Sequence, residues 1–156
     1  MGIDDTDTKE EGATWTLAHN IAAEVECEGA RYLSHSLVQL YPVETRTQNC
    51  VSTALEFGCI DEKARIDVLK HIKDLLEEYT VSPETGMLSL SAFEGNRLAE
   101  YGQRCKSGKL TREYALSTIQ EQGVDVWMNG NGIIGALAAI PYVATPDTSV
   151  ILKPQD

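Results

Sequence analysis

Residues 1–16 read Met-Gly-Ile-Asp-Asp-Thr-Asp-Thr-Lys-Glu-Glu-Gly-Ala-Thr-Trp-Thr. This stretch places Asp4, Asp5 and Asp7 close together, and a helical pattern begins soon after Gly12. Closely spaced carboxylates on an irregular segment repel one another, and a hard cation such as Mg²⁺ relieves that repulsion. The first amide groups of a helix have no intrahelical partner and favour anions. The order of residues therefore favours a site where a divalent metal and a phosphate meet.

The same stretch also fits a purely structural role. Aspartates are common in turns and at helix caps, and the whole chain is acidic, with a formal net charge of -11. Short motifs of the Asp-x-Asp kind occur often by chance. The residues alone leave both interpretations open.

Length and composition predict one domain spanning residues 1–156. A chain of this size buries roughly two-thirds of its unfolded surface. Hydrophobic residues at 42% and charged residues at 24% are ordinary globular values, which argues against a disordered chain. Nucleic-acid affinity rests largely on Lys and Arg, so the net charge of -11 predicts that this chain alone does not bind nucleic acid directly.

Cysteine usage predicts a cytoplasmic protein with reduced thiols. The sequence contains no Cys-x-x-Cys pair and no other zinc-binding spacing among its four cysteines, Cys27, Cys50, Cys59 and Cys105. The sequence shows no secretory signal and no apolar run of membrane-spanning length. We therefore expect no membrane partner.

Apolar periodicity predicts a mixture of helices and strands. The helices are expected over residues 14–27, 61–80, 96–105, 111–123 and 133–140, and the strands over residues 32–41, 50–57, 87–93 and 124–128. Asp61 and Thr111 are placed to cap two of the helices, and Gly123 to end one. We expect a single α+β domain with a mixed β-sheet and packed helices, in which the Asp4 loop and the turn at residues 129–132 converge at one end.

That turn is a second informative stretch. Asn129, Gly130, Asn131 and Gly132 follow the strand at 124–128, which we expect to be buried, and precede a helix of small residues. In such a turn backbone amides can approach a phosphate closely. The turn has no Walker lysine and no complete dinucleotide fingerprint. The structural alternative is a strand-to-helix turn whose small residues permit close helix packing.

Three motifs, in this order, resemble the ATP-dependent kinase domain of the archaeal tRNA-isoleucine agmatinylcytidine synthetases. They are residues 2–7, the Thr45-Arg46 pair with Asn49, Val51 and Ser52 after it, and residues 132–139. Residues 4–15 and 47–52 are in addition similar to methanogenesis marker protein 11, a methanogen family. Nearly the whole chain takes part in the resemblance.

The resemblance implies a Mg²⁺- and ATP-dependent site. Asp4, Asp5 and Asp7 would hold the metal and polarise phosphate oxygens, and Thr14 would be a phosphoacceptor or a phosphate ligand. Arg46 would meet phosphate. The residues that would contact the nucleotide are Thr6, Arg46, Asn49, Asn129, Gly130, Asn131 and Gly132.

The chain also departs from this family. Basic residues that the family carries in the glycine loop and before the Thr-Arg pair are replaced by Asn129, Asn131 and Glu44. The synthetases have further domains that grip tRNA, including a zinc-binding module, so we do not carry over the tRNA substrate. Their first motif follows an apolar strand, whereas Met1 directly precedes Gly2 here. We therefore expect an excised domain of a longer protein, with a less firmly anchored loop.

Three functional hypotheses follow. The first is a Mg²⁺-ATP-dependent phosphotransferase-like domain of an archaeal protein, linked to methanogenesis and related to tRNA-cytidine agmatinyl transfer enzymes, with an unidentified acceptor. The second is a non-catalytic nucleotide-binding or assembly module that contacts a protein partner or other domains of a longer chain. The third is an acidic structural domain that binds no ligand.

Overall fold

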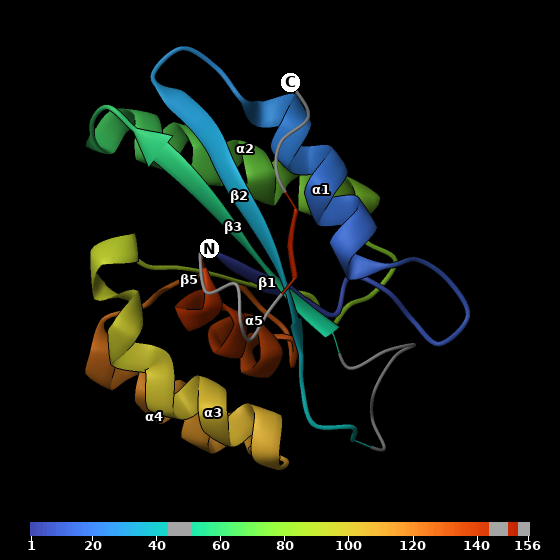
Figure 1. The fold of residues 1–156 in the computed structure, drawn as a ribbon. Helices are drawn as coiled ribbons and strands as arrows, with labels where there is room; N and C mark the ends of the chain where they lie inside the picture. Colours follow the sequence, from blue (N-terminus) through green and yellow to red (C-terminus); the bar gives the residue numbers. More distant parts are fainter. Residues whose placement is uncertain (44–50, 144–149, 153–156) are drawn as a thin grey trace.

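The fold of the computed structural model is a six-stranded sheet with helices on both faces (Figure 1). The structure describes residues 1–43 and 51–143, and the backbone of residues 150–152. The strands are β1 (Gly2–Asp4), β2 (Ala30–Gln39), β3 (Val51–Cys59), β4 (Gly86–Ser89), β5 (Asp125–Asn129) and β6 (Val150–Leu152). The α-helices are α1 (Thr14–Val25), α2 (Glu62–Tyr79), α3 (Ala99–Ser107), α4 (Arg112–Gln122) and α5 (Ile133–Ala139), and the 3-10 helices are η1 (Ala92–Leu98) and η2 (Ile140–Tyr142).

The strand order is β5-β4-β1-β3-β2-β6, and every described pair of neighbouring strands is antiparallel. The α+β class is therefore confirmed, but the directions of the described strands are not mixed as we expected. Strand β1 is joined to β2 through α1, and β3 is joined to β4 through α2, and in each case the two strands run in the same direction. An antiparallel strand lies between the members of each pair, β3 in the first and β1 in the second, so these two crossover connections leave no neighbouring strands parallel.

The shortest of the inner strands, β1, lies in the middle of the sheet. Gly2 and Ile3 pair with Ala54 and Thr53 of β3, and Gly2 also pairs with Leu88 of β4. A β-carbon on Gly2 would lie 1.8 Å from the carbonyl oxygen of Ala136, so glycine allows α5 to pack directly on this strand. Our expectation of a weakly anchored loop is wrong, because residues 2–4 themselves supply the central strand from which the loop departs.

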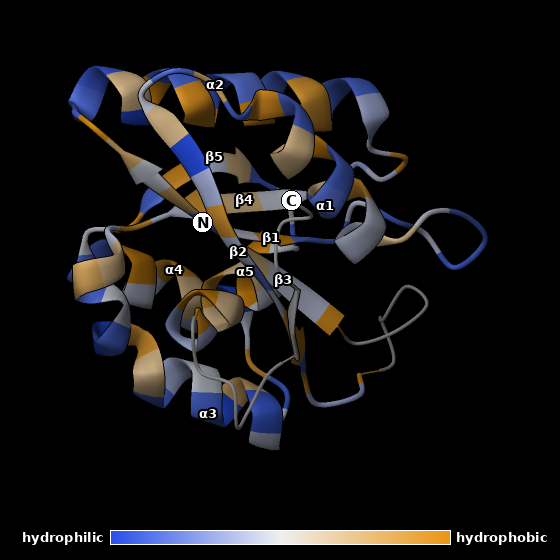
Figure 2. Ribbon diagram, turned by 45° about the horizontal axis from the view of Figure 1, so that its top comes forward, coloured by the Kyte–Doolittle hydropathy of each residue, from blue (hydrophilic) through white to orange (hydrophobic). Residues whose placement is uncertain are grey.

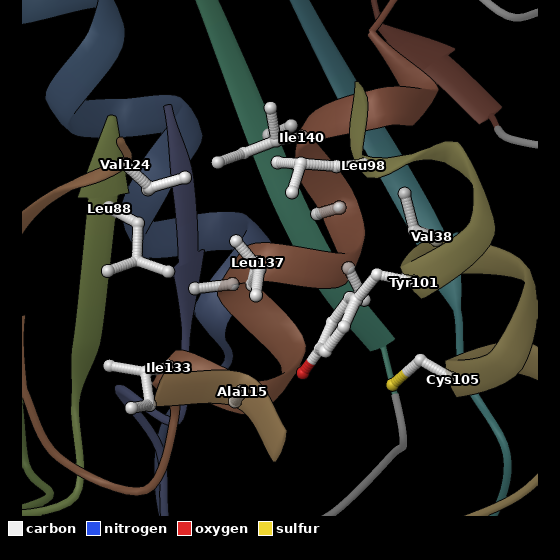
Figure 3. Packing of buried hydrophobic residues seen from close by; sticks show 14 of the residues in the cluster. Val38, Leu88, Leu98, Tyr101, Cys105, Ala115, Val124, Ile133, Leu137 and Ile140 are labelled. Atoms are coloured by element: carbon white, nitrogen blue, oxygen red, sulfur yellow. The ribbon is translucent and has the colours of Figure 1, made fainter. Parts of the chain in front are cut away.

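Each face of the sheet has its own hydrophobic core. On one face α1 and α2 pack on Ile3, Leu55 and Met87. Helix α2 is amphipathic, and Figure 2 shows apolar and polar residues alternating along it. On the other face α5 packs on the strands, and α3 and α4 pack on α5; Leu137 lies among the side chains of this second core (Figure 3). Strand β3 is central, which explains why residues 52–55 are buried on both faces.

Helix boundaries follow the capping signals. Asp61 accepts a hydrogen bond from the backbone amide of Ala64, at 2.8 Å, and α2 begins at the next residue. The hydroxyl of Thr111 accepts one from the amide of Tyr114, at 3.1 Å, before α4. Gly123 ends α4 in a left-handed conformation with φ 66. These three predictions are confirmed.

Two predicted strands differ from the structure. The strand expected over residues 87–93 ends at Ser89, because residues 92–98 form η1, where Phe93 is 96% exposed and has no sheet face to cover. The strand expected to be buried at 124–128 is β5, which lies at an edge of the sheet, with Asp125 and Val126 exposed. Apolar composition alone does not distinguish an edge strand from a buried one.

Candidate functional site

The acidic loop, defined here as residues 5–13, joins β1 to α1 and is tied to the connection between α2 and β4. The carbonyl oxygen of Thr6 accepts hydrogen bonds from the Val81 amide and the Thr80 hydroxyl, each at 3.1 Å. The hydroxyl of Thr85 donates to the carbonyl oxygen of Asp5, also at 3.1 Å. Asp5 itself is left-handed, with φ 53, a conformation that Asp tolerates better than most residues. The loop is therefore a fixed part of the fold.

A buried network joins this loop to the first turn of α1. The Thr14 hydroxyl accepts hydrogen bonds from the amide and the hydroxyl of Thr6, both at 3.2 Å, and donates to Oδ1 of Asp7 at 3.4 Å. Thr14 is 5% exposed and Asp7 6%. In this arrangement the Thr14 hydroxyl is used to orient Asp7 and Thr6.

The carboxylates of Asp4 and Asp5 are held in an environment that disfavours their charge. Burial, followed by repulsion from Asp5, raises the pKa of Asp4 well above its ordinary value. Burial, followed by repulsion from Asp7 and Glu84, raises the pKa of Asp5 to about 6. A cation bound between these groups would reverse both effects, because an opposite charge favours the ionised form.

Asp4 connects the loop to α5. Its Oδ1 accepts a hydrogen bond from the amide of Asp5 at 2.8 Å. Its Oδ2 lies where Gly135 has no side chain, and a β-carbon built there would be 1.8 Å from that oxygen. Gly135 is therefore required for the position of the Asp4 carboxylate.

The glycine turn, residues 129–132, is held on its amide side by the segment before β4. The amides of Gly130 and Gly132 donate to the carbonyl oxygens of Thr85 and Glu84, at 3.0 and 2.8 Å, and the amide of Asn131 donates to a carboxylate oxygen of Glu84 at 2.8 Å. Because these amides already donate hydrogen bonds within the protein, they are not free to bind a phosphate. The structure therefore favours close packing of the backbone as the reason for the glycines. A β-carbon on Gly132 would lie 2.6 Å from the Asp4 carbonyl oxygen.

Arg112 on α4 holds the carbonyl side of the same turn. Its guanidinium donates to the carbonyl oxygens of Asn129 and Gly130, at 2.9 and 3.0 Å, and to the side-chain oxygens of Asn129 and Asn131, at 2.8 and 3.4 Å. The turn therefore has a cation beside it although its own residues are uncharged. Sequence reasoning missed Arg112, because nothing in the residues around it signals a contact with a turn so far along the chain.

The acidic loop, the glycine turn and the α3–α4 connection surround one cavity of about 780 Å³. Drug-sized and cofactor ligands occupy pockets of roughly 300–1,000 Å³. Acidic side chains at this cavity are Asp4, Asp5, Asp7, Glu84 and Glu113; basic ones are Lys9, Lys109 and Arg112; apolar ones include Leu40, Tyr41, Cys105, Leu110 and Ile134. The cavity can thus offer oxygen ligands, cations and an apolar surface to one ligand.

The structure brings together some of the residues that the sequence singled out. Asp4, Asp5, Asp7 and Asn131 line the cavity, which confirms that the loop and the turn converge. Within the described part of the chain, the cavity lining does not include Thr6, Thr14, Asn129, Gly130 or Gly132. Glu44, Arg46 and Asn49 lie outside the described residues. The wall formed by residues 105–113 was not foreseen.

Oxygen donors of this kind suit Mg²⁺, but they form no complete cage. Within residues 1–43 and 51–143, no three Asp, Glu, His or Cys side chains are grouped so that they could hold a metal ion by themselves. Mg²⁺ commonly binds through one or two carboxylates, with waters and substrate phosphates as the other ligands. Asp4, Asp5 and Asp7, which line the cavity, could make that smaller protein contribution.

The chain is similar to the curated but uncharacterized protein MJ0921 of Methanocaldococcus jannaschii. The two are 46% identical over 146 residues, which cover 90% of this chain and 48% of MJ0921. The chain thus spans about half of that relative's length. Across the described residues, no helix combines the length and apolarity that a membrane crossing requires.

Solved structures of TiaS have the same fold. The complex of TiaS with tRNA and ATP matches with a TM-score of 0.80 and 22% identity, covering 90% of this chain and 35% of the TiaS chain. Apo TiaS, a tRNA agmatidine synthetase, matches with a TM-score of 0.72 and 24% identity, covering 90% and 34%.

A family model described as the TiaS TCKD domain matches residues 1–131. That match covers β1 to β5, the acidic loop and most of the glycine turn. The similarity to methanogenesis marker protein 11 stays a prediction. The chain itself belongs to the TiaS TCKD domain family.

Proposed function

We propose that this chain is a Mg²⁺- and ATP-dependent phosphotransferase-like domain, related to the tRNA-modifying enzyme TiaS. The observation that carries the proposal is the cavity at which Asp4, Asp5 and Asp7 meet Asn131 and a set of basic side chains. A nucleotide needs each of these: oxygen ligands for its metal, cations for its phosphates and an apolar surface for its base.

The aspartates have separate roles in this proposal. Asp4 and Asp5 would provide the protein ligands of Mg²⁺, which when bound supplies charge neutralisation at the phosphate oxygens. Asp7 would remain oriented toward the cavity by Thr14 and would accept hydrogen bonds from metal-bound water or ligand. Because the Thr14 hydroxyl is buried, we assign it this orienting role in place of the phosphoacceptor role that the resemblance implies.

The glycine turn acts indirectly. Gly130 and Gly132 would allow the turn to lie close to residues 84–86, so that Asn131 reaches the cavity. Thr6 would fix the loop, and Asn129 would contribute through Arg112. Arg46 and Asn49 keep the nucleotide-binding role that the resemblance implies.

Relatives support ATP as the ligand. TiaS has been solved with tRNA and ATP, and with tRNA, AMPCPP and agmatine. This chain spans only about a third of TiaS. The proposal therefore leaves the phosphate acceptor unidentified, and it assigns any contact with tRNA to other parts of a longer protein. We further propose that the protein acts in the cytoplasm and that its function is linked to methanogenesis.

Calorimetric titration of Mg²⁺-ATP tests the proposal. We expect saturable binding to the parent chain, weakened at least tenfold by Asp5→Asn. Asp67→Asn is the matched control, because Asp67 is an exposed carboxylate on α2 that pairs with Lys63. The same affinity in all three proteins, or no binding to the parent, would reject the proposal.

A second candidate function is a nucleotide-binding or assembly module without turnover. It is favoured by the burial of the Thr14 hydroxyl and by the use of the turn amides within the protein. This module would bind Mg²⁺-ATP in the titration but leave it unhydrolysed. Measuring ADP and AMP after prolonged incubation distinguishes the two functions.

A further inference from the structure

The three basic side chains at the cavity are not equivalent. Arg112 already donates four hydrogen bonds to the glycine turn. Lys9 and Lys109, by contrast, have no hydrogen bond or ion pair with any residue that the structure describes. Lys9 belongs to the acidic loop, and Lys109 lies between α3 and α4. Among the described residues at the cavity, Arg112 is thus held in place by hydrogen bonds, whereas the ammonium groups of Lys9 and Lys109 are free to bind a ligand.

Free basic side chains are uncommon elsewhere in the described chain. Lys63, Arg65, Lys73, Arg97 and Arg104 each form an ion pair. Among the described residues, Arg31 and Lys70 are the other basic side chains without a partner, so half of the free cations lie at this cavity. A chain of net charge -11 offers many carboxylates. Within the described residues, the two lysines nevertheless remain unpaired, although Asp5, Glu84 and Glu113 line the same cavity.

The two lysines, which are unpaired among the described residues, can offset the negative charge of the cavity when an anionic ligand binds. Five carboxylates at the cavity would repel the phosphate chain of a nucleotide unless cations meet it. A lysine ammonium on a flexible stem binds phosphate as a point charge and can adjust to it. Because the two lysines come from separate segments, they can approach a bound phosphate chain from two directions.

We propose that Lys9 and Lys109 are phosphate-binding residues of the cavity, which grip the polyphosphate chain of the nucleotide from the acidic loop and from the α3–α4 connection. This inference rests on the proposed function, because it names the residues that bind the anionic part of the same ligand. The apolar side chains Tyr41, Leu110 and Ile134 are left for the base.

The test measures dissociation constants for Mg²⁺-tripolyphosphate, Mg²⁺-ATP and adenosine by calorimetry. The variants are Lys9→Gln, Lys109→Gln and their combination, and Lys70→Gln on α2 is the matched control. We expect each cavity variant to bind tripolyphosphate and ATP about tenfold more weakly, since a hydrogen bond to a charged group is worth about 1.5 kcal/mol or more. Adenosine binding and the melting temperature should not change, because neither side chain forms a hydrogen bond or ion pair with another described residue.

The outcomes separate the two proposals. Loss of phosphate affinity in the Lys9 and Lys109 variants, with Lys70→Gln unchanged, supports the inference. If the parent binds Mg²⁺-ATP and the double variant binds it equally well, the inference is overturned and the proposed function stands. If the parent binds neither tripolyphosphate nor ATP, both are overturned.

Discussion

The hydroxyl of Thr14 donates a hydrogen bond to the carboxylate of Asp7, with Oγ1 and Oδ1 3.4 Å apart. The same hydroxyl accepts from the amide and the hydroxyl of Thr6. A residue at the start of α1 thereby determines the shape of the acidic loop. Substitutions in this network should therefore affect the site and the fold together.

Thr14→Val should lower the free energy of unfolding by about 1–3 kcal/mol, because it keeps the volume of the side chain but leaves the buried donors of Thr6 without an acceptor. Thr14→Ser retains the hydroxyl and should stay within about 1 kcal/mol of the parent. Urea denaturation measures both values. Equal stability of the valine and serine variants would show that the network does not hold the loop.

Asp5→Asn should stabilise the chain at pH 8 without Mg²⁺. The folded pKa of Asp5, about 6, exceeds its ordinary value of 3.8, so ionisation destabilises the folded state above pH 6 and the penalty disappears below pH 3.8. We expect a gain of about 1 kcal/mol, which allows for the partial exposure of this side chain. Asparagine also tolerates the left-handed backbone at this position.

Adding Mg²⁺ should reverse that order, because it stabilises the parent more than Asp5→Asn by binding the folded state. Thermal melting at several Mg²⁺ concentrations checks this. Identical Mg²⁺ dependence of the melting temperature in the two proteins would argue against a role of Asp5 in metal binding.

His35 should make the chain sensitive to acid. It is fully buried on β2, stacks on His19 with ring centroids 5.8 Å apart, and shares a hydrogen bond with the Thr53 hydroxyl. Burial, followed by the charge of His19, lowers the pKa of His35 to about 4 from 6.5. The unfolded chain therefore binds the proton first, and the stability that comes from this group is lost as pH falls from 6.5 to 4.

The expected loss is roughly 3 kcal/mol over that interval. His35→Leu cannot take up this proton and should lack this part of the pH dependence, whereas His71→Gln, a change at an exposed histidine of α2, should retain it. Asp4 and Asp5 are present in all three proteins, so their opposite contribution cancels in the comparison. Parallel pH profiles for the parent and His35→Leu would contradict this prediction.

Gly135→Ala should displace the Asp4 carboxylate, because the new β-carbon would lie 1.8 Å from its Oδ2. We expect a loss of Mg²⁺-ATP affinity of at least tenfold. Gly95→Ala is the control, since a β-carbon there would come no closer than 3.8 Å to its neighbours. Titration of both variants checks the prediction, and equal affinities would show that the Asp4 position does not matter for binding.

Local signals in the sequence predicted much of the fold. Asp61, Thr111 and Gly123 mark helix ends by hydrogen bonds and dihedral angles that involve only near neighbours, so they could be read directly. Strand β1 could not be predicted in this way, because three residues are too few to show a periodic pattern. Its place in the sheet is set by pairing with β3 and β4, which are distant in the sequence. Phe93 was misplaced because apolar character does not show that a residue is exposed.

The candidate site was predictable only where its residues form a motif. The aspartates were found because their types and spacing indicate metal and phosphate chemistry, and Asn131 because it lies in the glycine turn and in a segment that resembles the synthetase family. Arg112, Lys9 and Lys109 reach the cavity through tertiary packing of α3, α4 and the acidic loop, which no local pattern encodes. The Thr14 hydroxyl was assigned to the ligand, and its burial behind Asp7 became visible only in three dimensions.

Phosphorus NMR of ATP with Mg²⁺ and this protein tests the central claim most directly. We predict that the ATP resonances broaden on binding and then decline as ADP and phosphate, or AMP and phosphate products, appear. Both effects should be lost in Asp5→Asn and retained in Asp67→Asn. Sharp ATP resonances that stay unchanged in the presence of the parent chain would contradict the account of this cavity as a Mg²⁺-ATP site.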